Sequence, residues 1–413
     1  MPEDSARRVV ITGIGAVTPI GNGVDGLRAG LRANRSGIRE VSAFDTTGFR
    51  TKVAGEVRGF NVEDFVTKKA VKRLDRFTGF AIAAARMAAE DARLELDKNR
   101  HAGVVMGSAL GGLAFAEEQH DVFREKGLRS VNPNLALMVF GAASSCQIAI
   151  ELGLTGPNLT NSNSCASGAM AVGEAFEMIR AGRADVILAG GAEAPLSPLT
   201  FGSFTLIRAM TARNDDPEGS CRPFDMGRDG FVMGEGSAVL VLEEMDRAVA
   251  RGARIYAEVR GYGLTNDAYH MTSSRDNGLC AAESIAIALR EAGVTPADIG
   301  YINAHGSSTP MNDRNETTAL KAALGGYAKS IPVSGTKPFH AHPLGATGAI
   351  EAAICALAIM DEYLPPTLNL TDPDPECDLD LIALIGRSVR IDHALSTSFG
   401  FGGMNAALII SRV

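Results

Sequence analysis

Tryptophan is absent from the 413-residue sequence, and tyrosine occurs only six times. Proteins that hold single strands of nucleic acid stack the bases on aromatic rings, so this composition argues against that class. An excess of positive charge is also lacking, because 40 Lys and Arg oppose 48 Asp and Glu and leave a net charge of −8. A phosphate-backbone binder would need clustered basic residues. We interpret the cluster Lys68, Lys69, Lys72 and Arg73 as a solvated helix face, and no nucleic-acid partner is expected.

The sequence has no run of ~18 uninterrupted apolar residues, the length with which a helix crosses a bilayer. The apolar segment after Arg8 is broken by Gly13 and Gly15 and precedes no small-residue cleavage site, so we interpret it as a buried first strand and its turn. The six cysteines form no CxxC pair, a pattern typical of reduced thiols. We therefore expect a cytoplasmic protein that does not bind membranes.

Short β-rich apolar segments alternate with longer helical patterns, which predicts an α/β fold. The predicted strands are 9–12, 102–106, 185–189, 238–242, 255–261, 300–303, 331–334, 394–398 and 406–411, and the predicted helices include 78–91, 167–181, 281–292, 315–324 and 346–360. The two halves of the chain resemble each other: VMGSALGG matches INAHGSST, and NSNSCASGAMAVGEAF matches KPFHAHPLGATGAIEAA in plan. This predicts a duplicated unit with halves 1–253 and 254–413 and a site where they meet.

Three residues are candidates for catalysis. Cys165 precedes an expected helix, whose N-terminal N–H groups stabilise a thiolate, so it is either a covalent nucleophile or an inert packing cysteine. His305 and His342 each follow a predicted strand, where ligands bind in α/β sheets, or they are core or capping residues. His340 and His342 form an HxH pair, but without a third ligand in a recognisable spacing we expect no metal.

Three further segments are rich in glycine or charge. One fails a known cofactor-binding pattern, and the other two each allow two interpretations. Gly13-Ile14-Gly15 begins like a dinucleotide fingerprint, but the next glycine, Gly21, is misplaced. The glycines around Phe401 form either a tight turn or a loop whose backbone approaches a substrate. RPFDMGRDGFVMGEG is either an ordinary surface turn or a structured loop near the mouth of the site.

SCASG, RPFDMGRDGFVMGEG, NAHGSSTPMND, a lysine-led HPLGATG and SFGFGG occur in this order. Over essentially the whole chain they resemble the elongating β-ketoacyl-acyl-carrier-protein synthase II group, which are condensing enzymes of the thiolase superfamily. The resemblance implies a thiolase fold with two βαβαβαββ halves in five αβαβα layers. It also implies condensation of an acyl group, held as a cysteine thioester, with malonyl-acyl carrier protein, in fatty acid or type II polyketide or polyene elongation. No cofactor is implied.

The resemblance also implies residue roles. Cys165 is the nucleophile, and His305 and His342 stabilise the enolate formed on decarboxylation. The N–H groups of Cys165 and Phe401 form an oxyanion hole, and Phe401 also gates malonyl entry. The supporting residues are Lys337 and Glu351 as a charged pair, Thr272, Ser307 and Thr309 at the phosphopantetheine arm, and Leu110 and Phe204 along the acyl pocket.

The chain departs from the usual family pattern in the lysine loop. Pro338 and Ala341 replace a serine and a glycine, and His340 is an additional histidine. Asn163-Ser164 precedes the cysteine in place of Thr-Ala, and Ser307 replaces a threonine. These changes raise the possibility of a secondary-metabolite ketosynthase.

Other classes fit less well. A non-catalytic chain-length partner subunit typically lacks the cysteine, a thiolase needs a second cysteine where this chain has Phe401, and a chain-initiating synthase pairs its cysteine with one histidine and an asparagine.

The expected partners are acyl carrier protein and a second chain. The second chain makes a homodimer, or a heterodimer with a ketosynthase-like subunit. The stretch NPNLALMVFGAAS is either part of such an interface or an ordinary buried helix. Because carrier proteins are acidic, we expect Lys or Arg near the pocket mouth, and the candidates are Lys68, Lys69, Arg124 and Arg129.

Overall fold

The computed structural model describes residues 7–275 and 277–413. Ten strands form the main part of one large sheet. They are β1 (Val9–Thr18), β5 (Gly103–Gly107), β6 (Asn158–Asn161), β7 (Val186–Glu193), β8 (Gly236–Glu244), β9 (Ala257–Asn266), β10 (Tyr301–Ala304), β11 (Pro332–Gly335), β15 (His393–Gly400) and β16 (Met404–Ser411). Short strands β2 (Gly21–Asn22) and β13 (Asp380–Leu381) extend this sheet.

The strand order shows the duplication directly. The N-terminal half has the order β6-β5-β7-β8-β1, and the C-terminal half has the corresponding order β11-β10-β15-β16-β9. In each half the first three strands are parallel and the last two pairings are antiparallel. The two half-sheets are joined where β1 pairs with β9 over Val9, Val10 and Ile11.

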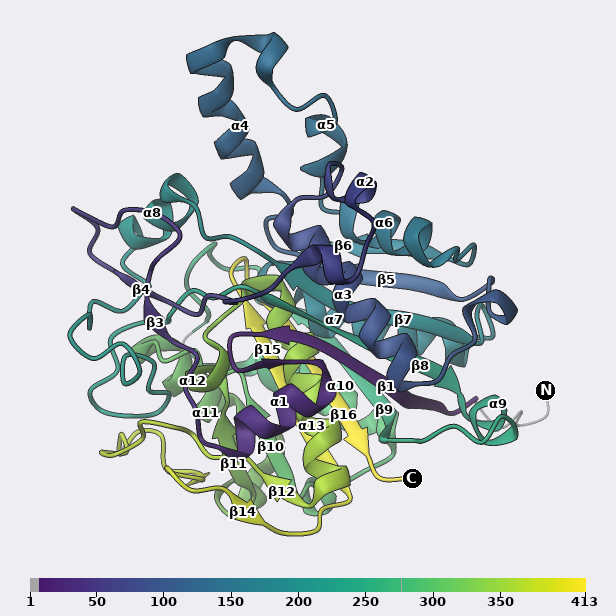
Figure 1. Cartoon of the computed structure of the whole chain (residues 1–413). Helices are drawn as coiled ribbons and strands as arrows, with labels where there is room; N and C mark the ends of the chain where they lie inside the picture. The colour runs from purple at the N-terminus through teal and green to yellow at the C-terminus, as the bar shows by residue number, and fades with distance from the viewer. Residues whose placement is uncertain (1–6, 276) are drawn as a thin grey trace.

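Helices form three layers around the half-sheets (Figure 1). The outer helices of the N-terminal half are α3 (Arg76–Asp91) and α6 (Ala143–Leu152), and those of the C-terminal half are α10 (Leu279–Ala292) and α11 (Pro310–Leu324). Between the half-sheets, α7 (Ser167–Arg180) packs against α13 (Thr347–Asp361). Alternate residues of β8 enter different cores, Leu240 the central one and Val239 the outer one, as the period of a strand requires. This is the five-layer thiolase fold predicted from the sequence.

Glycine allows the two central helices to approach closely. A Cβ at Gly168 would lie 2.8 Å from the Ala349 nitrogen and 2.9 Å from the Gly345 oxygen. A Cβ at Gly348 would lie 2.6 Å from the Ala169 nitrogen. Small residues at the start of both helices therefore set the distance between the two halves.

The predicted elements differ from the structure mainly at their ends. The first strand continues through Gly13 and Gly15 to Thr18, where we had expected a turn, because α3 packs on the bare glycine backbone: a Cβ at Gly15 would lie 1.9 Å from Ala84 O. Helix α11 begins at Pro310, five residues before the predicted start, since proline is tolerated at the first helical position.

Several elements were not predicted. They are α1 (Gly23–Arg32), α4 (Leu113–Lys126), α6, α8 (Pro198–Leu206), the four-residue α12 (Lys337–His340), α9 (Met245–Ala250), β6, and the two-residue strands β2, β3 (Arg39–Glu40), β4 (Val53–Ala54), β12 (Tyr363–Leu364), β13 and β14 (Arg387–Ser388). The helix face expected at Lys68, Lys69, Lys72 and Arg73 includes the four-residue α2 (Lys68–Val71), and NPNLALMVFGAAS contains the short α5 (Leu135–Met138). Helices α4 and α5 project away from the sheet (Figure 1). Within NPNLALMVFGAAS, Leu137 and Phe140 are exposed, so the interpretation of this stretch as an ordinary buried helix is wrong.

One stretch of the described chain, Leu344–Asp361, is long and apolar enough to cross a membrane. It contains α13, and most of it is buried between the half-sheets, so it is a core helix of this fold.

Candidate active site

A cavity of about 390 Å³ opens where the two halves meet. The predicted site residues that line it are Cys165, Thr272, His305, Ser307, Thr309, His342 and Phe401. They come from the ends of β10 and β15, from the loops before α7 and α13, and from the segment after β9. The structure therefore brings together residues that are far apart in the sequence.

Cys165 lies in a short 3-10 turn, Ser164–Ala166, directly before α7. Burial raises the pKa of its thiol, while a hydrogen bond from the Ser164 hydroxyl, one from the Phe401 N–H and the charge of Lys337 lower it. The position before a helix was predicted correctly, but in the closed site burial outweighs the groups that favour the thiolate.

Lys337 is fully buried and ties His305 to Glu351. Its Nζ donates to Glu351 Oε1 at 2.7 Å and to the His305 carbonyl, and lies 3.5 Å from His305 Nδ1. An ammonium group only donates hydrogen bonds, so Nδ1 must be the acceptor of His305 and Nε2 carries the ring proton. Burial raises the pKa of the Glu351 carboxyl to about 7 despite the nearby Lys337 charge.

His342 is held from the other side of the cavity by α13. Its Nδ1 lies 2.8 Å from the Thr347 hydroxyl, and its ring stands at 83° to that of His305 with centroids 5.4 Å apart. Burial, and then the charge of Lys337, lower the pKa of both imidazoles well below 6.5. Both rings are therefore neutral at pH 7, and a neutral ring whose Nδ1 accepts a hydrogen bond can donate one from Nε2.

Phe401 follows β15, and its backbone N–H lowers the pKa of the Cys165 thiol. The Phe401 ring stacks on Phe204 with centroids 6.4 Å apart. Leu110 and Phe204 pack in the same apolar cluster as Cys165, yet neither is among the described residues that line the cavity. In this structure they lie behind its wall.

Two buried carboxylates that the sequence analysis missed support the site. Glu193, at the end of β7, accepts hydrogen bonds from the N–H groups of Ala109 (2.6 Å), Leu110 (3.1 Å) and Gly345 (2.9 Å). Glu316, on α11, accepts from the N–H groups of His305 (2.7 Å) and Gly306 (2.8 Å). Burial raises the pKa of each carboxyl to about 7. The signal available in the sequence was a glutamate at the end of an apolar strand, in GGAE, but charge alone did not set it apart.

The lysine loop shows what its departures do. Ala341 has φ 58° and ψ −157°, a conformation that favours glycine, and its Cβ lies where a side chain on Gly55 or Gly234 would collide. The ring of His340 is fully buried, with Nε2 3.3 Å from the Thr336 hydroxyl, and it is not among the described residues that line the cavity. In the described residues no three His, Cys, Asp or Glu side chains are grouped to hold a metal.

Comparison with known proteins gives the same assignment. The model for "Beta-ketoacyl synthase, N-terminal domain" matches residues 6–248, and that for "Beta-ketoacyl synthase, C-terminal domain" matches residues 256–371. The predicted boundary at 253/254 lies between α9 and β9 and remains a prediction.

Individual relatives match along the full length. A 3-oxoacyl-[acyl-carrier-protein] synthase 2 from Synechocystis sp. is 44% identical over 408 residues, which are 98% of each chain. The ishigamide ketosynthase/chain length factor structure has a TM-score of 0.93 at 36% identity, covering 99% of this chain and 100% of that one. A type II polyketide ketosynthase, in complex with its acyl-carrier protein, has a TM-score of 0.87 at 36% identity, over 99% and 100% of the two chains. The chain belongs to the β-ketoacyl synthase family of thiolase-fold condensing enzymes, acyltransferases that catalyse decarboxylative condensation in fatty acid or polyketide elongation.

Proposed function

We propose that this chain is itself the catalytic subunit and that Cys165, His305 and His342 carry out its chemistry. The observation that supports this most is their presence in one cavity, with both imidazoles neutral and with the Nδ1 of each engaged by Lys337 or Thr347. A subunit that only set chain length would not require a thiol and two donor rings in the same enclosed space.

The proposed reaction has two stages. The Cys165 thiol loses its proton as its sulfur attacks the thioester carbonyl of an acyl carrier protein. The C–S bond to the carrier breaks, an acyl-cysteine remains, and the departing carrier sulfur takes up the proton and leaves as a thiol. Malonyl-carrier then enters, its C–CO₂ bond breaks, and the electron pair moves into an enolate that His305 and His342 stabilise with hydrogen bonds. The enolate carbon attacks the acyl-cysteine carbonyl, whose oxygen accepts hydrogen bonds from the N–H groups of Cys165 and Phe401. The C–S bond breaks and leaves 3-oxoacyl-carrier and a free cysteine thiolate.

The carrier's phosphopantetheine arm is assigned to the cavity wall at Thr272, Ser307 and Thr309. All three line the cavity, and the Ser307 and Thr309 hydroxyls lie 2.9 Å apart. We place the acidic carrier on basic residues near the mouth. Arg208 lines the cavity, whereas the candidates Lys68, Lys69, Arg124 and Arg129 are not among its described lining residues and remain predictions. No cofactor is needed, because malonyl decarboxylation supplies the carbon nucleophile.

The partner of the chain is proposed to be a second copy that docks on the β6 edge. In the described sheet β6 pairs only with β5, so its outer edge presents unpaired backbone groups. Exposed apolar side chains surround this edge: Leu137 (65%), Phe140 (43%), Ile150 (69%) and Leu159 (48%). Native mass spectrometry of the purified chain distinguishes this homodimer from a chain that stays monomeric until a different ketosynthase-like subunit is added.

We assign the enzyme to the cytoplasm, because its buried thiols are free in the structure. Between housekeeping fatty acid synthesis and secondary-metabolite chain building, the altered lysine loop favours the second. The substrate panel in the following experiment tests this choice.

The decisive experiment is intact-protein mass spectrometry after mixing the purified chain with acyl-carriers of different length and unsaturation. The expected result is one acyl adduct on the wild type and none on Cys165→Ala. The chain that loads best identifies the substrate class. Folded wild-type protein that forms no adduct with any acyl-carrier would refute the catalytic role of the isolated chain.

A further inference from the structure

The loop 221–230, which contains the whole RPFDMGRDG segment, belongs to the N-terminal half but is bonded to the C-terminal half. Arg222 N donates to Ser308 Oγ at 2.9 Å, and Gly230 N donates to Ser308 O at 3.0 Å. Ser308 is fully buried and has φ 67°, a backbone conformation that few non-glycine residues adopt. The loop therefore holds the middle residue of the turn whose outer members, Ser307 and Thr309, line the cavity.

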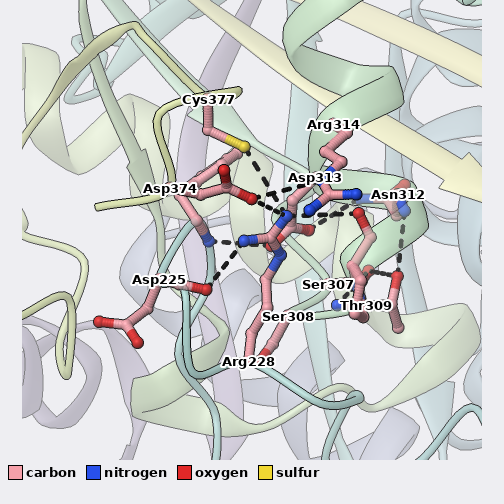
Figure 2. A network of polar contacts seen from close by, with 12 residues as sticks. Asp225, Arg228, Ser307, Ser308, Thr309, Asn312, Asp313, Arg314, Asp374 and Cys377 are labelled. Atoms are coloured by element: carbon pink, nitrogen blue, oxygen red, sulfur yellow. Dashed lines mark hydrogen bonds and ion pairs between the residues drawn. The ribbon is translucent and has the colours of Figure 1, made fainter. Parts of the chain in front are cut away.

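Arg228 lies at the centre of this contact, with its guanidinium between Asp313 and Asp374 (Figure 2). Its Nη2 is 2.8 Å from Asp374 Oδ2, and its Nε is 3.4 Å from Asp313 Oδ2. Nη1 donates to Asp225 O at 2.8 Å, and Nη2 donates to Pro310 O at 3.3 Å. All three charged side chains are almost completely buried. Asp374 Oδ2 also lies 3.3 Å from Arg314 Nε, and Asp313 Oδ2 accepts from Phe224 N at 2.9 Å, so Arg228 is one member of a shared buried network.

Two of the groups that Arg228 contacts, Pro310 O and Asp313, belong to the first turn of α11. This turn follows directly after Ser307 and Thr309, which line the cavity. Thr309 is the N-cap residue of α11, and its Oγ1 accepts from Asn312 N at 3.2 Å and bonds Ser307 Oγ. Arg228 bonds the carbonyl of Pro310, the residue next to Thr309, and pairs with Asp313 on the same turn. Arg228 thus contacts the turn that carries the two hydroxyls, although it is not among the described residues that line the cavity.

We propose that Arg228 is a positioning residue that holds Ser307 and Thr309 in place for the arm of carrier-bound substrates. The inference rests on the proposed function, in which these two hydroxyls bind phosphopantetheine. The planar guanidinium serves two carboxylates and two carbonyls in different directions, whereas a lysine ammonium at the end of a flexible stem cannot reach all four. Loss of the guanidinium shifts the start of α11 and leaves the acylation of Cys165 unchanged.

The test uses two assays on Arg228→Lys and Arg228→Gln. The first measures the malonyl-carrier dependence of condensation and gives KM and kcat. The second measures acylation of Cys165 by p-nitrophenyl hexanoate, an ester that has no pantetheine arm, from the released nitrophenolate. We expect KM for malonyl-carrier to rise roughly 10- to 100-fold, as displaced substrate-positioning groups do, with the acylation rate unchanged.

Arg28→Gln is the matched control. Arg28 joins the two halves elsewhere, through its 2.7 Å contact with Asp361, and is not among the described residues around the cavity. It should leave both assays unchanged. Arg228→Lys keeps a positive charge between the two carboxylates and provides a folded variant if Arg228→Gln does not fold.

The outcomes separate the two proposals. A wild type that condenses, together with an Arg228→Lys variant whose KM is unchanged, would overturn the positioning role alone. Equal losses in both assays would also overturn it, because they indicate a general structural defect. A wild type that neither loads acyl groups nor condenses would refute the proposed function itself.

Discussion

The loops before α7 and α13 are counterparts in the duplicated fold, but they carry different chemistry. Each contains a 3-10 turn whose first residue has positive φ, Ser164 at 55° and Leu344 at 35°. The second residue of the turn is Cys165 in one half and Gly345 in the other. The N–H of Gly345 binds the Glu193 carboxylate, whereas the counterpart at Cys165 faces the substrate cavity.

The first helical residue differs in the same way. Ser167 Oγ accepts a hydrogen bond from the Asn163 N–H, so it stabilises its own loop. Thr347 Oγ1 bonds the Nδ1 of His342, so it orients a catalytic candidate. Duplication provides two similar polar turns at one interface. The turn before α7 holds the proposed nucleophile, Cys165. The turn before α13 binds the Glu193 carboxylate through the Gly345 N–H and holds His342, the hydrogen-bond donor.

The comparison predicts that each turn serves one chemical stage. The turn with Cys165 serves acyl transfer, and the turn before α13 serves malonyl decarboxylation. Cys165→Ala should lower condensation by about 10⁴-fold or more, because no other group replaces the nucleophile. It should still release CO₂ from malonyl-carrier, since His305 and His342 remain. Radiometric CO₂ release beside product formation checks this, and a parallel loss of both activities would contradict the separation.

His342→Ala should have the opposite effect. Loss of one oxyanion donor costs about 10²- to 10³-fold, and we expect that loss in malonyl decarboxylation. Acyl loading of Cys165, followed by mass spectrometry, should be retained. Thr347→Val is the graded control, because it keeps the ring and removes only its 2.8 Å contact, so its defect should be smaller.

Gly345→Ala tests whether tight packing leaves no room for a side chain in the turn before α13. The added Cβ would lie 2.3 Å from Ala109 N and 2.7 Å from Glu193 Oε2, so the backbone must shift, and the free energy of unfolding should fall by roughly 1–3 kcal/mol. Gly326→Ala is matched to it, because a Cβ there meets no atom within 4 Å. Urea denaturation compares the two, and similar midpoints would contradict the packing argument.

The last prediction concerns the pH dependence of stability. The folded pKa of Glu193 is about 7, above its ordinary value of 4.5, so the folded state binds its proton more tightly than the unfolded state. The contribution of Glu193 to the free energy of unfolding should therefore be fully present below pH 4.5. It should fall as pH rises from about 4.5 to 7, by about 1.4 kcal/mol per pH unit. Glu193→Gln should flatten that slope. Denaturation at pH 5, 6 and 7 measures it, and an unchanged slope would exclude this source.

Sequence reasoning succeeded where a residue type and its position carry the chemistry. Cys165, His305 and His342 could be placed because each lies between a strand and a helix, and their meeting followed from the duplication. The central helices were placed to within one residue at their starts, because Gly and Ala crowd the face that another helix must approach.

The remaining features depend on contacts between distant segments. Glu193 and Glu316 are ordinary acidic residues until folding directs backbone N–H groups at them. Arg228 was noticed only as part of a charged motif, and its buried partners come from two other segments. Helix α4 lacks a long apolar face against the core, so no periodicity announced it.

The pairing of β1 with β9 has a consequence for the order of events during synthesis. The apolar inner face of the first half emerges from the ribosome well before β9, and α13, which covers it, is made later still. Domains generally fold as they emerge, and the outer core of this half uses only its own residues, but its inner core is completed only when α13 exists. The nascent chain therefore exposes this apolar face until α13 has been made.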